Sequence, residues 1–233
     1  MGAPSLSDYR RIVGDEPIDE LERLASGLRG SRVQHVNSTR VGGGVAEILQ
    51  RMVPLMREVG LEAFWDVIEG DEAFFRVTKA FHNALQGLAQ DLDEGDFEVY
   101  CAANRRNAER LAFRGDFVFV HDPQPAALVE FARREVSDPI LVWRCHIDAS
   151  APDPRVWEFL KPYVAKYHAA VISAPAFAQT LDIPQYLVPP SIDPLSEKNR
   201  PLAPEEVRAV VERFGLDPKR PIVLQVSRFD RFK

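Results

Sequence analysis

Two apolar segments of this sequence end in side chains that could bind and activate a polar substrate. The first is followed by His121 and Asp122, and the second by Arg144, His146 and Asp148. Imidazole donates or accepts a proton near neutral pH and a carboxylate accepts hydrogen bonds, so these side chains suit hydroxyl binding and proton transfer. We predict catalytic roles for His146 and Asp122, and substrate binding by the other three residues.

Simpler explanations stay open at these positions. Turn chemistry alone favours Asp before Pro, as in Asp122-Pro123, and Asp148 suits the N-cap of a following helix. A histidine at a strand end can also be held within the core. One polar strand end is compatible with a structural role, whereas three on one sheet edge favour a binding cleft.

The third polar strand end is the run Gly42-Gly43-Gly44, which precedes a helical pattern. Backbone N–H groups at the positive end of a helix dipole bind phosphate or sugar hydroxyls, and we predict substrate binding by these glycines. The alternative is a flexible turn without a ligand. A nicotinamide nucleotide is a weaker candidate, because Glu47 stands where the Gly-x-Gly-x-x-Gly fingerprint needs Gly or Ala. A Walker loop lacks its Gly-Lys-Ser or Gly-Lys-Thr.

Other titratable residues are expected to be structural or solvated. We place Asp91 and Asp93 in a solvated loop, three arginines on a solvated helix face (Arg105, Arg106 and Arg110), and His82 and His168 within helices. No zinc or serine-hydrolase signature is present, so no metal site is predicted.

Short apolar runs alternate with longer helical patterns along most of the chain. The strand candidates are 32–37, 63–68, 116–120, 140–145, 169–173, 186–188 and 222–226. The helix candidates are 18–28, 44–59, 72–88, 97–113, 125–135, 154–167 and 204–214. Such alternation predicts parallel βαβ units in a doubly wound, Rossmann-like α/β sheet, whose carboxyl edge would gather the candidate residues.

Composition excludes several functional classes. The 233 residues are 45% hydrophobic, which fits one globular domain or one and a fraction. The net charge of −6 would repel nucleic acid. No apolar run reaches the roughly 18 residues of a membrane span, and the first residues carry no signal pattern, so we expect a soluble cytoplasmic protein without membrane partners. Cys101 and Cys145 alone form no disulfide framework.

The Pro- and Ser-rich stretch after residue 190 suggests a domain boundary. We expect a Rossmann-like domain over 1–190, a linker over 191–203, and the beginning of a second, truncated α/β domain over 204–233. A buried parallel strand at 222–226 would need neighbours on both sides.

Several segments in combination resemble the trehalose glycosyltransferring synthases of glycosyltransferase family four. They are His-Val-Asn-Ser-Thr with Gly-Gly-Gly-Val-Ala-Glu, His-Asp-Pro-Gln, Trp-Arg-Cys-His-Ile-Asp, Val-Pro-Pro-Ser-Ile-Asp-Pro and Gln-Val-Ser-Arg-Phe-Asp-Arg-Phe-Lys. The resemblance extends from about Tyr9 to Lys233. It implies the GT-B architecture, in which two Rossmann-like domains face a cleft, with 1–190 as the acceptor-side domain and the donor-binding one after it.

The resemblance also implies a reaction. A retaining enzyme would move glucose from a nucleoside-diphosphate glucose, such as ADP- or UDP-glucose, to free glucose and form trehalose. Asp122 and His146 would contact the reacting sugars, and Arg228 and Lys233 would hold the donor phosphates. No tightly bound cofactor is implied; Mg²⁺ with the diphosphate and a homodimer both stay open. Residues 1–233 alone are expected to be inactive.

Two alternatives stay open. A retaining trehalose phosphorylase shares much of the same pattern and would use phosphate as its second substrate. A non-catalytic module that binds a sugar or a nucleotide is the alternative from a different class.

Overall fold

The computed structural model describes residues 4–217 and 219–227. The chain divides into two compact units, Met1–Asp193 and Pro194–Lys233, which are considered separately. The assignment of a linker and of a second domain after the first unit stays a prediction.

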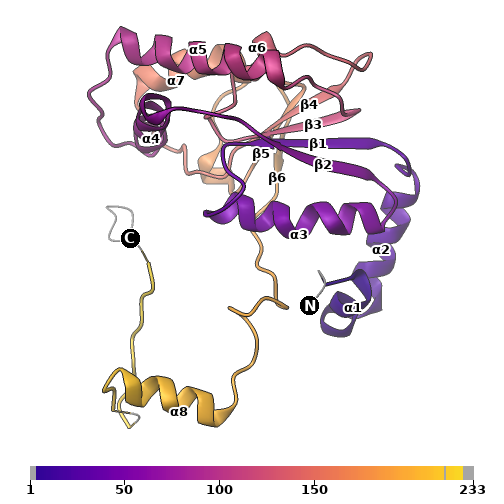
Figure 1. Cartoon of the computed structure of the whole chain (residues 1–233), viewed down its shortest axis with the longest axis vertical. Coiled ribbons are helices and arrows are strands. Elements are labelled where there is room, and N and C mark those ends of the chain that lie inside the picture. Colours follow the sequence, from indigo (N-terminus) through magenta and orange to yellow (C-terminus); the bar gives the residue numbers. More distant parts are fainter. Residues whose placement is uncertain (1–3, 218, 228–233) are drawn as a thin grey trace. The chain divides into compact units, whose positions relative to one another are not determined.

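The first unit is built on a six-stranded sheet in which all strands are parallel (Figure 1). The strands are β1 (Arg32–Asn37), β2 (Glu62–Val67), β3 (Phe117–His121), β4 (Ile140–Arg144), β5 (Ala169–Ile172) and β6 (Gln185–Leu187). Their spatial order is β2-β1-β3-β4-β5-β6. The chain therefore moves outward from β1 to β2 and returns on the other side of β1, which makes the β1/β3 junction the switch point where ligands bind in such sheets.

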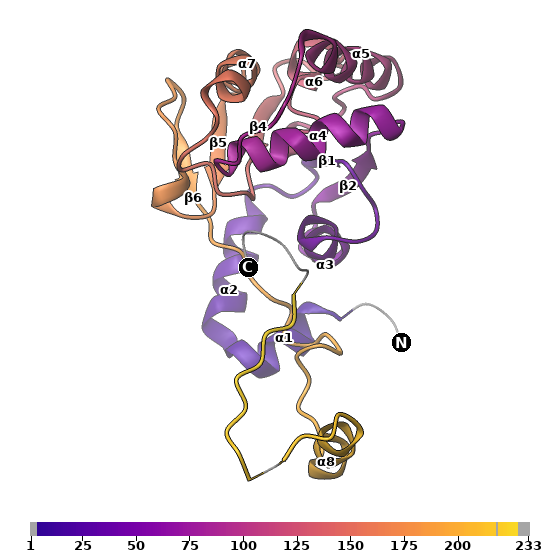
Figure 2. The same ribbon diagram turned by 90° about the vertical axis from the view of Figure 1, so that its left-hand side faces the viewer.

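Helices cover both faces of the sheet (Figures 1 and 2). They are α1 (Leu6–Val13), α2 (Asp15–Ser26), α3 (Gly44–Glu58), α4 (Glu72–Leu85), α5 (Glu94–Arg110), α6 (Leu128–Phe131) and α7 (Pro154–Val164), with a 3₁₀ turn at Pro175–Phe177. On the α4, α5 and α7 side the largest apolar cluster surrounds Phe81 and Tyr100, which are fully buried. On the other side, Leu49 and Val53 of α3 pack against Val33 of β1. The predicted doubly wound parallel sheet is confirmed.

A small helical pair precedes the sheet. The sequence predicts one helix at 18–28, whereas the structure has α1 as well. Helix α1 begins with a capping box between Ser5 and Asp8. Leu6 and Ile18 pack with Val59 at the end of α3, and the Leu6 N–H donates to the Glu58 carboxylate (3.0 Å). These contacts hold the pair against α3.

Two helix boundaries differ from the predictions for identifiable reasons. The helix expected at 97–113 begins earlier, because Asp93 is its N-cap and accepts the Asp96 N–H (3.0 Å). Asp91 and Asp93 lie in an exposed loop, as predicted, and Asp93 also caps the helix. The helix expected at 125–135 is reduced to α6. Residues 133–135 instead bond to Phe113, whose N–H donates to Arg133 O (2.8 Å) and whose carbonyl accepts the Glu135 N–H (2.9 Å).

Two further predictions are wrong. His168 lies after α7, exposed, and its Nδ1 accepts the Leu141 N–H (2.9 Å), so it is not within a helix. In the second unit, helix α8 (Pro204–Arg213) is present but residues 222–226 form no strand. Their apolar side chains are exposed, Val223 most of all at 102% exposure. A strand needs a neighbouring strand for its hydrogen bonds, and the described residues of this unit supply none.

No helix in the part of the chain that the structure describes is both long and apolar enough to span a membrane.

Candidate functional site

The carboxyl edge of the sheet brings four of the predicted site residues together. His121 ends β3 and lies opposite Arg144 at the end of β4. Asp122 and His146 follow directly and are joined by a hydrogen bond between the Asp122 carboxylate and the His146 backbone N–H (2.8 Å). Because β3 lies at the switch point, this cluster occupies the position that favours ligand binding in such sheets. Its functional roles stay predictions.

Asp122 is held in an unusual backbone conformation. Its φ is +64°, in the left-handed region that few non-glycine residues adopt. The Asp122 N–H donates to Arg144 O (2.8 Å), and its carbonyl accepts the Trp143 Nε1–H (3.1 Å). Burial raises the pKa of the Asp122 carboxyl to about 6, against the opposing effects of the His146 N–H and Arg144. Asp122 is thus a carboxyl group poised to exchange a proton near neutral pH.

Three histidines form a connected row beneath this edge, which we call the histidine network. His35 Nδ1 lies 3.0 Å from His121 Nε2, and His121 Nδ1 lies 2.9 Å from His146 Nε2. His35 and His121 are buried, whereas His146 is part-exposed. The other nitrogen of His35, Nε2, is 3.4 Å from the Met56 sulfur on α3. The network therefore runs from the core under α3 to the candidate site.

Burial keeps all three rings neutral at physiological pH. It lowers the pKa of His35 to about 4, and burial followed by the Arg144 charge lowers that of His146 to about 4. Burial lowers the pKa of His121 well below its usual value, and the neighbouring His35, His146 and Arg144 act in the same direction. Neutral imidazole has one N–H donor and one acceptor nitrogen. The network is therefore a chain of directional hydrogen bonds.

Arg144 is buried, and its two terminal nitrogens differ in their hydrogen bonds. Its Nη2 donates to Val188 O (2.6 Å), while Nη1 has no hydrogen-bond partner among the described residues. Burial lowers the pKa of this guanidinium, with Asp122 acting in the opposite direction. A direct substrate contact by Arg144 stays a prediction, since its identified role is to join the β4 end to the segment after β6.

Asp148 does not cap a helix. Its carboxylate accepts the Ser150 N–H (2.8 Å) in a local turn, and α7 is instead capped by Asp153, which accepts the Arg155 N–H (3.0 Å). The N-cap explanation for Asp148 is therefore wrong, and its substrate-binding role stays a prediction.

The glycine run forms the entry to α3. Gly42 and Gly43 have φ of +75° and +83°, and Gly43 is the N-cap without any side-chain cap. No atom of the described residues, apart from the adjoining chain, lies within 4 Å of the position that a Cβ would take at any of the three glycines. The entry to this 15-residue helix is therefore open beside the glycines and has no side-chain cap. This geometry suits an anionic or hydroxylated ligand.

Backbone conformation predicts different effects at two neighbouring glycines. Gly43→Ala should destabilise the chain by about 1–3 kcal/mol, because its φ of +83° and ψ of 155° lie in a region that essentially only glycine adopts. Gly44→Ala is the matched control: it is the first residue of the helix, without positive φ, and should be neutral or slightly stabilising. Urea unfolding of the two variants measures the difference. Equal stabilities would contradict the assigned loop conformation.

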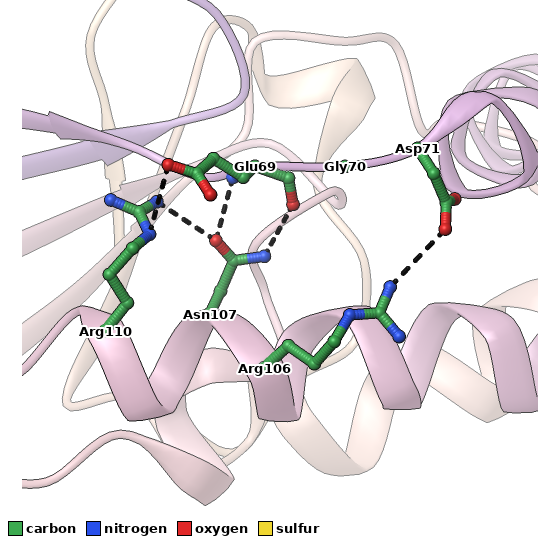
Figure 3. A pocket seen from close by; sticks show the side chains of 6 residues that line it. All are labelled: Glu69, Gly70, Asp71, Arg106, Asn107 and Arg110. Atoms are coloured by element: carbon green, nitrogen blue, oxygen red, sulfur yellow. Dashed lines mark hydrogen bonds and ion pairs between the residues drawn. The ribbon is translucent and has the colours of Figure 1, made fainter.

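A separate hollow of about 450 Å³ lies where β2 meets α5 (Figure 3). Glu69 pairs with Arg110 (3.4 Å) and Asp71 with Arg106 (3.6 Å), while the Asn107 side chain bonds both backbone groups of Glu69. Arg106 and Arg110 are exposed, as predicted for a solvated arginine face, and each also pairs with a carboxylate. Because both arginines are already paired with carboxylates, this hollow has no net positive charge with which to bind an anion.

Two of the predicted site residues, Arg228 and Lys233, lie outside the described residues. Within the described ranges, no group of three His, Cys, Asp or Glu side chains is placed to hold a metal ion.

Sequence reasoning missed His35 and Met56. The signal for His35 was its place in a strand whose alternate residues Val33, His35 and Asn37 share one face. A buried histidine on that face needs hydrogen-bond partners. Met56 gave no such signal, because a methionine on the apolar stripe of a helix is an ordinary core residue.

Comparisons with known proteins found a matching family model and several similar proteins. The family model described as "Trehalose synthase, N-terminal domain" matches residues 35–179. The chain is 49% identical over its whole length to 56% of a trehalose synthase from Pyrococcus horikoshii, and 48% identical over its whole length to 57% of one from Rubrobacter xylanophilus. It is 26% identical over 98% of its length to 36% of a trehalose phosphorylase from Pleurotus pulmonarius. The chain thus spans little more than half the length of the two synthases.

Proposed function

Because the chain belongs to the trehalose synthase N-terminal domain family, we propose that it forms the acceptor-side domain of a retaining glycosyltransferase that makes trehalose. The donor is a nucleoside-diphosphate glucose and the acceptor is free glucose. The observation that supports this most directly is the cluster of Asp122 and His146 at the switch point of the sheet. Both side chains can bind sugar hydroxyls there.

The donor's diphosphate is proposed to bind near the glycine run. As the glycosidic bond breaks, the leaving diphosphate gains negative charge, and backbone N–H groups at the start of α3 are proposed to stabilise that charge. Arg228 and Lys233 are proposed to add two cations, whose charge-assisted hydrogen bonds strengthen in the transition state. The departing phosphate oxygen would take the proton of the acceptor hydroxyl on the same face. No tightly bound cofactor is proposed; Mg²⁺ carried by the diphosphate is compatible with this arrangement.

The test is product formation by the full gene product. Incubation with ADP-glucose or UDP-glucose and free glucose should release one nucleoside diphosphate per trehalose formed. Proton NMR of the product should show the α,α linkage that retention requires. Absence of trehalose with every nucleoside-diphosphate glucose would contradict the proposal.

A trehalose phosphorylase is the second candidate, since the Pleurotus pulmonarius relative bears that name and matches 98% of the chain. Phosphate-dependent release of glucose 1-phosphate from trehalose by the same preparation would favour it. The nearly twofold higher identity to the proteins named trehalose synthase favours a synthase over a phosphorylase.

A binding module without catalysis is distinguished by His146→Ala in the full gene product. Loss of trehalose synthesis is expected for a glycosyltransferase. Sugar affinity by calorimetry together with unchanged synthesis would instead favour the module.

A further inference from the structure

The histidine network ends at a methionine sulfur, and this contact has a chemical consequence. His35 Nε2 lies 3.4 Å from Met56 Sδ, and the nitrogen at the opposite end of the network, His146 Nδ1, has no hydrogen-bond partner among the described residues. The two inner contacts, 3.0 and 2.9 Å long, each need one shared proton. The position of the proton on each ring therefore determines its position on the other two rings.

Counting protons leaves only two arrangements. Three neutral rings carry three N–H protons, and two of them fill the two inner hydrogen bonds. The third proton must sit at one end of the network, on His35 Nε2 or on His146 Nδ1. In the first case all three rings are protonated at Nε2, and in the second case all three are protonated at Nδ1. Any mixed pattern leaves one inner contact with two protons or with none.

The contact between His35 and Met56, at the buried end of the network, decides between these two arrangements. A thioether sulfur accepts a weak hydrogen bond and donates none. With the proton on His35 Nε2, that nitrogen donates to Met56 Sδ; without it, a lone pair faces a sulfur lone pair at 3.4 Å. His35 is 1% exposed, so water does not supply an alternative partner. At the other end His146 is part-exposed, and solvent or ligand satisfies either form.

We propose that Met56 and His35 are positioning residues that fix the histidine network in its Nε2-protonated form, so that His146 presents an unprotonated Nδ1 to the candidate site. That nitrogen accepts a hydrogen bond and donates none. It therefore favours a hydroxyl donor over a carboxylate or a fully ionised phosphate, which offer only acceptors. If the proposed function holds, this donor is a sugar hydroxyl, and the network selects the glucosyl part over the diphosphate at this point.

Nitrogen-15 NMR of labelled histidine in the 233-residue chain tests the proposal, because it distinguishes protonated from unprotonated ring nitrogens. The chain has five histidines, and His82→Gln and His168→Gln identify the two outside the network. At pH 7.5 the expected spectrum has His35, His121 and His146 all protonated at Nε2. A proton on His146 Nδ1 would overturn the proposal, and this readout does not depend on catalytic activity.

Met56→Leu tests the part played by the sulfur. Leucine has a similar volume but accepts no hydrogen bond, so the tautomer preference should weaken and the two ring nitrogen signals of His146 should move toward each other. Met52→Leu, on the same helix and packed in the same apolar cluster, is the matched control and should keep the wild-type spectrum. A Met56→Leu spectrum identical to the wild type would remove Met56 from the proposal. If Met56→Leu does not fold, the wild-type spectrum still decides which end carries the proton.

Discussion

Replacing Asp122 by Asn should raise the melting temperature of the chain at pH 8 while reducing trehalose synthesis by the full gene product about 100-fold or more. Asparagine keeps the oxygen that accepts the His146 N–H and tolerates the positive φ of residue 122. It removes a carboxylate that burial disfavours. Function and stability are therefore expected to oppose each other at this residue.

The sign of the stability effect follows from the direction of the pKa shift. Folding raises the pKa of Asp122 from 3.8 to about 6, so the folded state binds the proton more tightly than the unfolded state. The charged carboxylate destabilises the fold above pH 6, and this cost disappears as the pH falls toward 4. Reduced for the partial exposure of Asp122, the gain from Asn is about 1–2 kcal/mol at pH 8, or several degrees in melting temperature.

The matched control is Asp138→Asn. Asp138 also has a positive φ, +50°, but its carboxylate is exposed. The Asp138→Asn variant therefore measures how well Asn tolerates a positive φ, without the effect of burying a carboxylate. Thermal unfolding at pH 8 and pH 4.5 should show a pH-dependent gain for Asp122→Asn alone. A gain equal to that of Asp138→Asn, or one independent of pH, would contradict the assignment.

Acidification from pH 7 to pH 4 should destabilise the chain by several kcal/mol through the histidine network. Folding lowers the pKa of His35 from 6.5 to about 4, so stability is complete above pH 6.5 and is lost as the unfolded state takes up protons below it. His35 alone accounts for about 3 kcal/mol. His121 and His146 act in the same direction, while Asp122 opposes them in part.

His35→Asn tests the origin of this acid sensitivity. The substitution removes one titrating ring, so the free energy of unfolding from urea titrations should depend less on pH between 6.5 and 4.5. The variant should be less stable than the wild type at pH 8, because His35 is buried and stacks on Phe119. His82→Asn, on helix α4 outside the network, is the control for a histidine loss as such. An unchanged pH dependence in His35→Asn would place the acid sensitivity elsewhere.

Most of the fold was predictable because local patterns carried it. The strand at 32–37 was predicted with its observed ends, and Gly44 and Pro154 begin helices where the sequence places them. The wrong predictions depend on tertiary contacts. Residues 133–135 form backbone hydrogen bonds with Phe113 in place of a helix, and residues 222–226 have a strand-like composition but no partner strand among the described residues. Local propensity is a weak prior that such contacts override.

The candidate site was predictable only at its edge. Side chains at the carboxyl ends of parallel strands converge whatever the strand order is, so His121, Asp122, Arg144 and His146 were named from the sequence. Asp148 was named as well, but its turn with Ser150 was not foreseen.

The sequence by itself determined the alternating strands and helices, the glycine entry to α3 and the polar strand ends, because periodicity and turn chemistry act over a few residues. Only the tertiary structure decided that β1 lies beside β3. That pairing brings His35 to His121 across 86 positions and buries both rings, which lowers the pKa of each. Desolvation depends on what packs around a group, and residues far apart in the chain supply that packing.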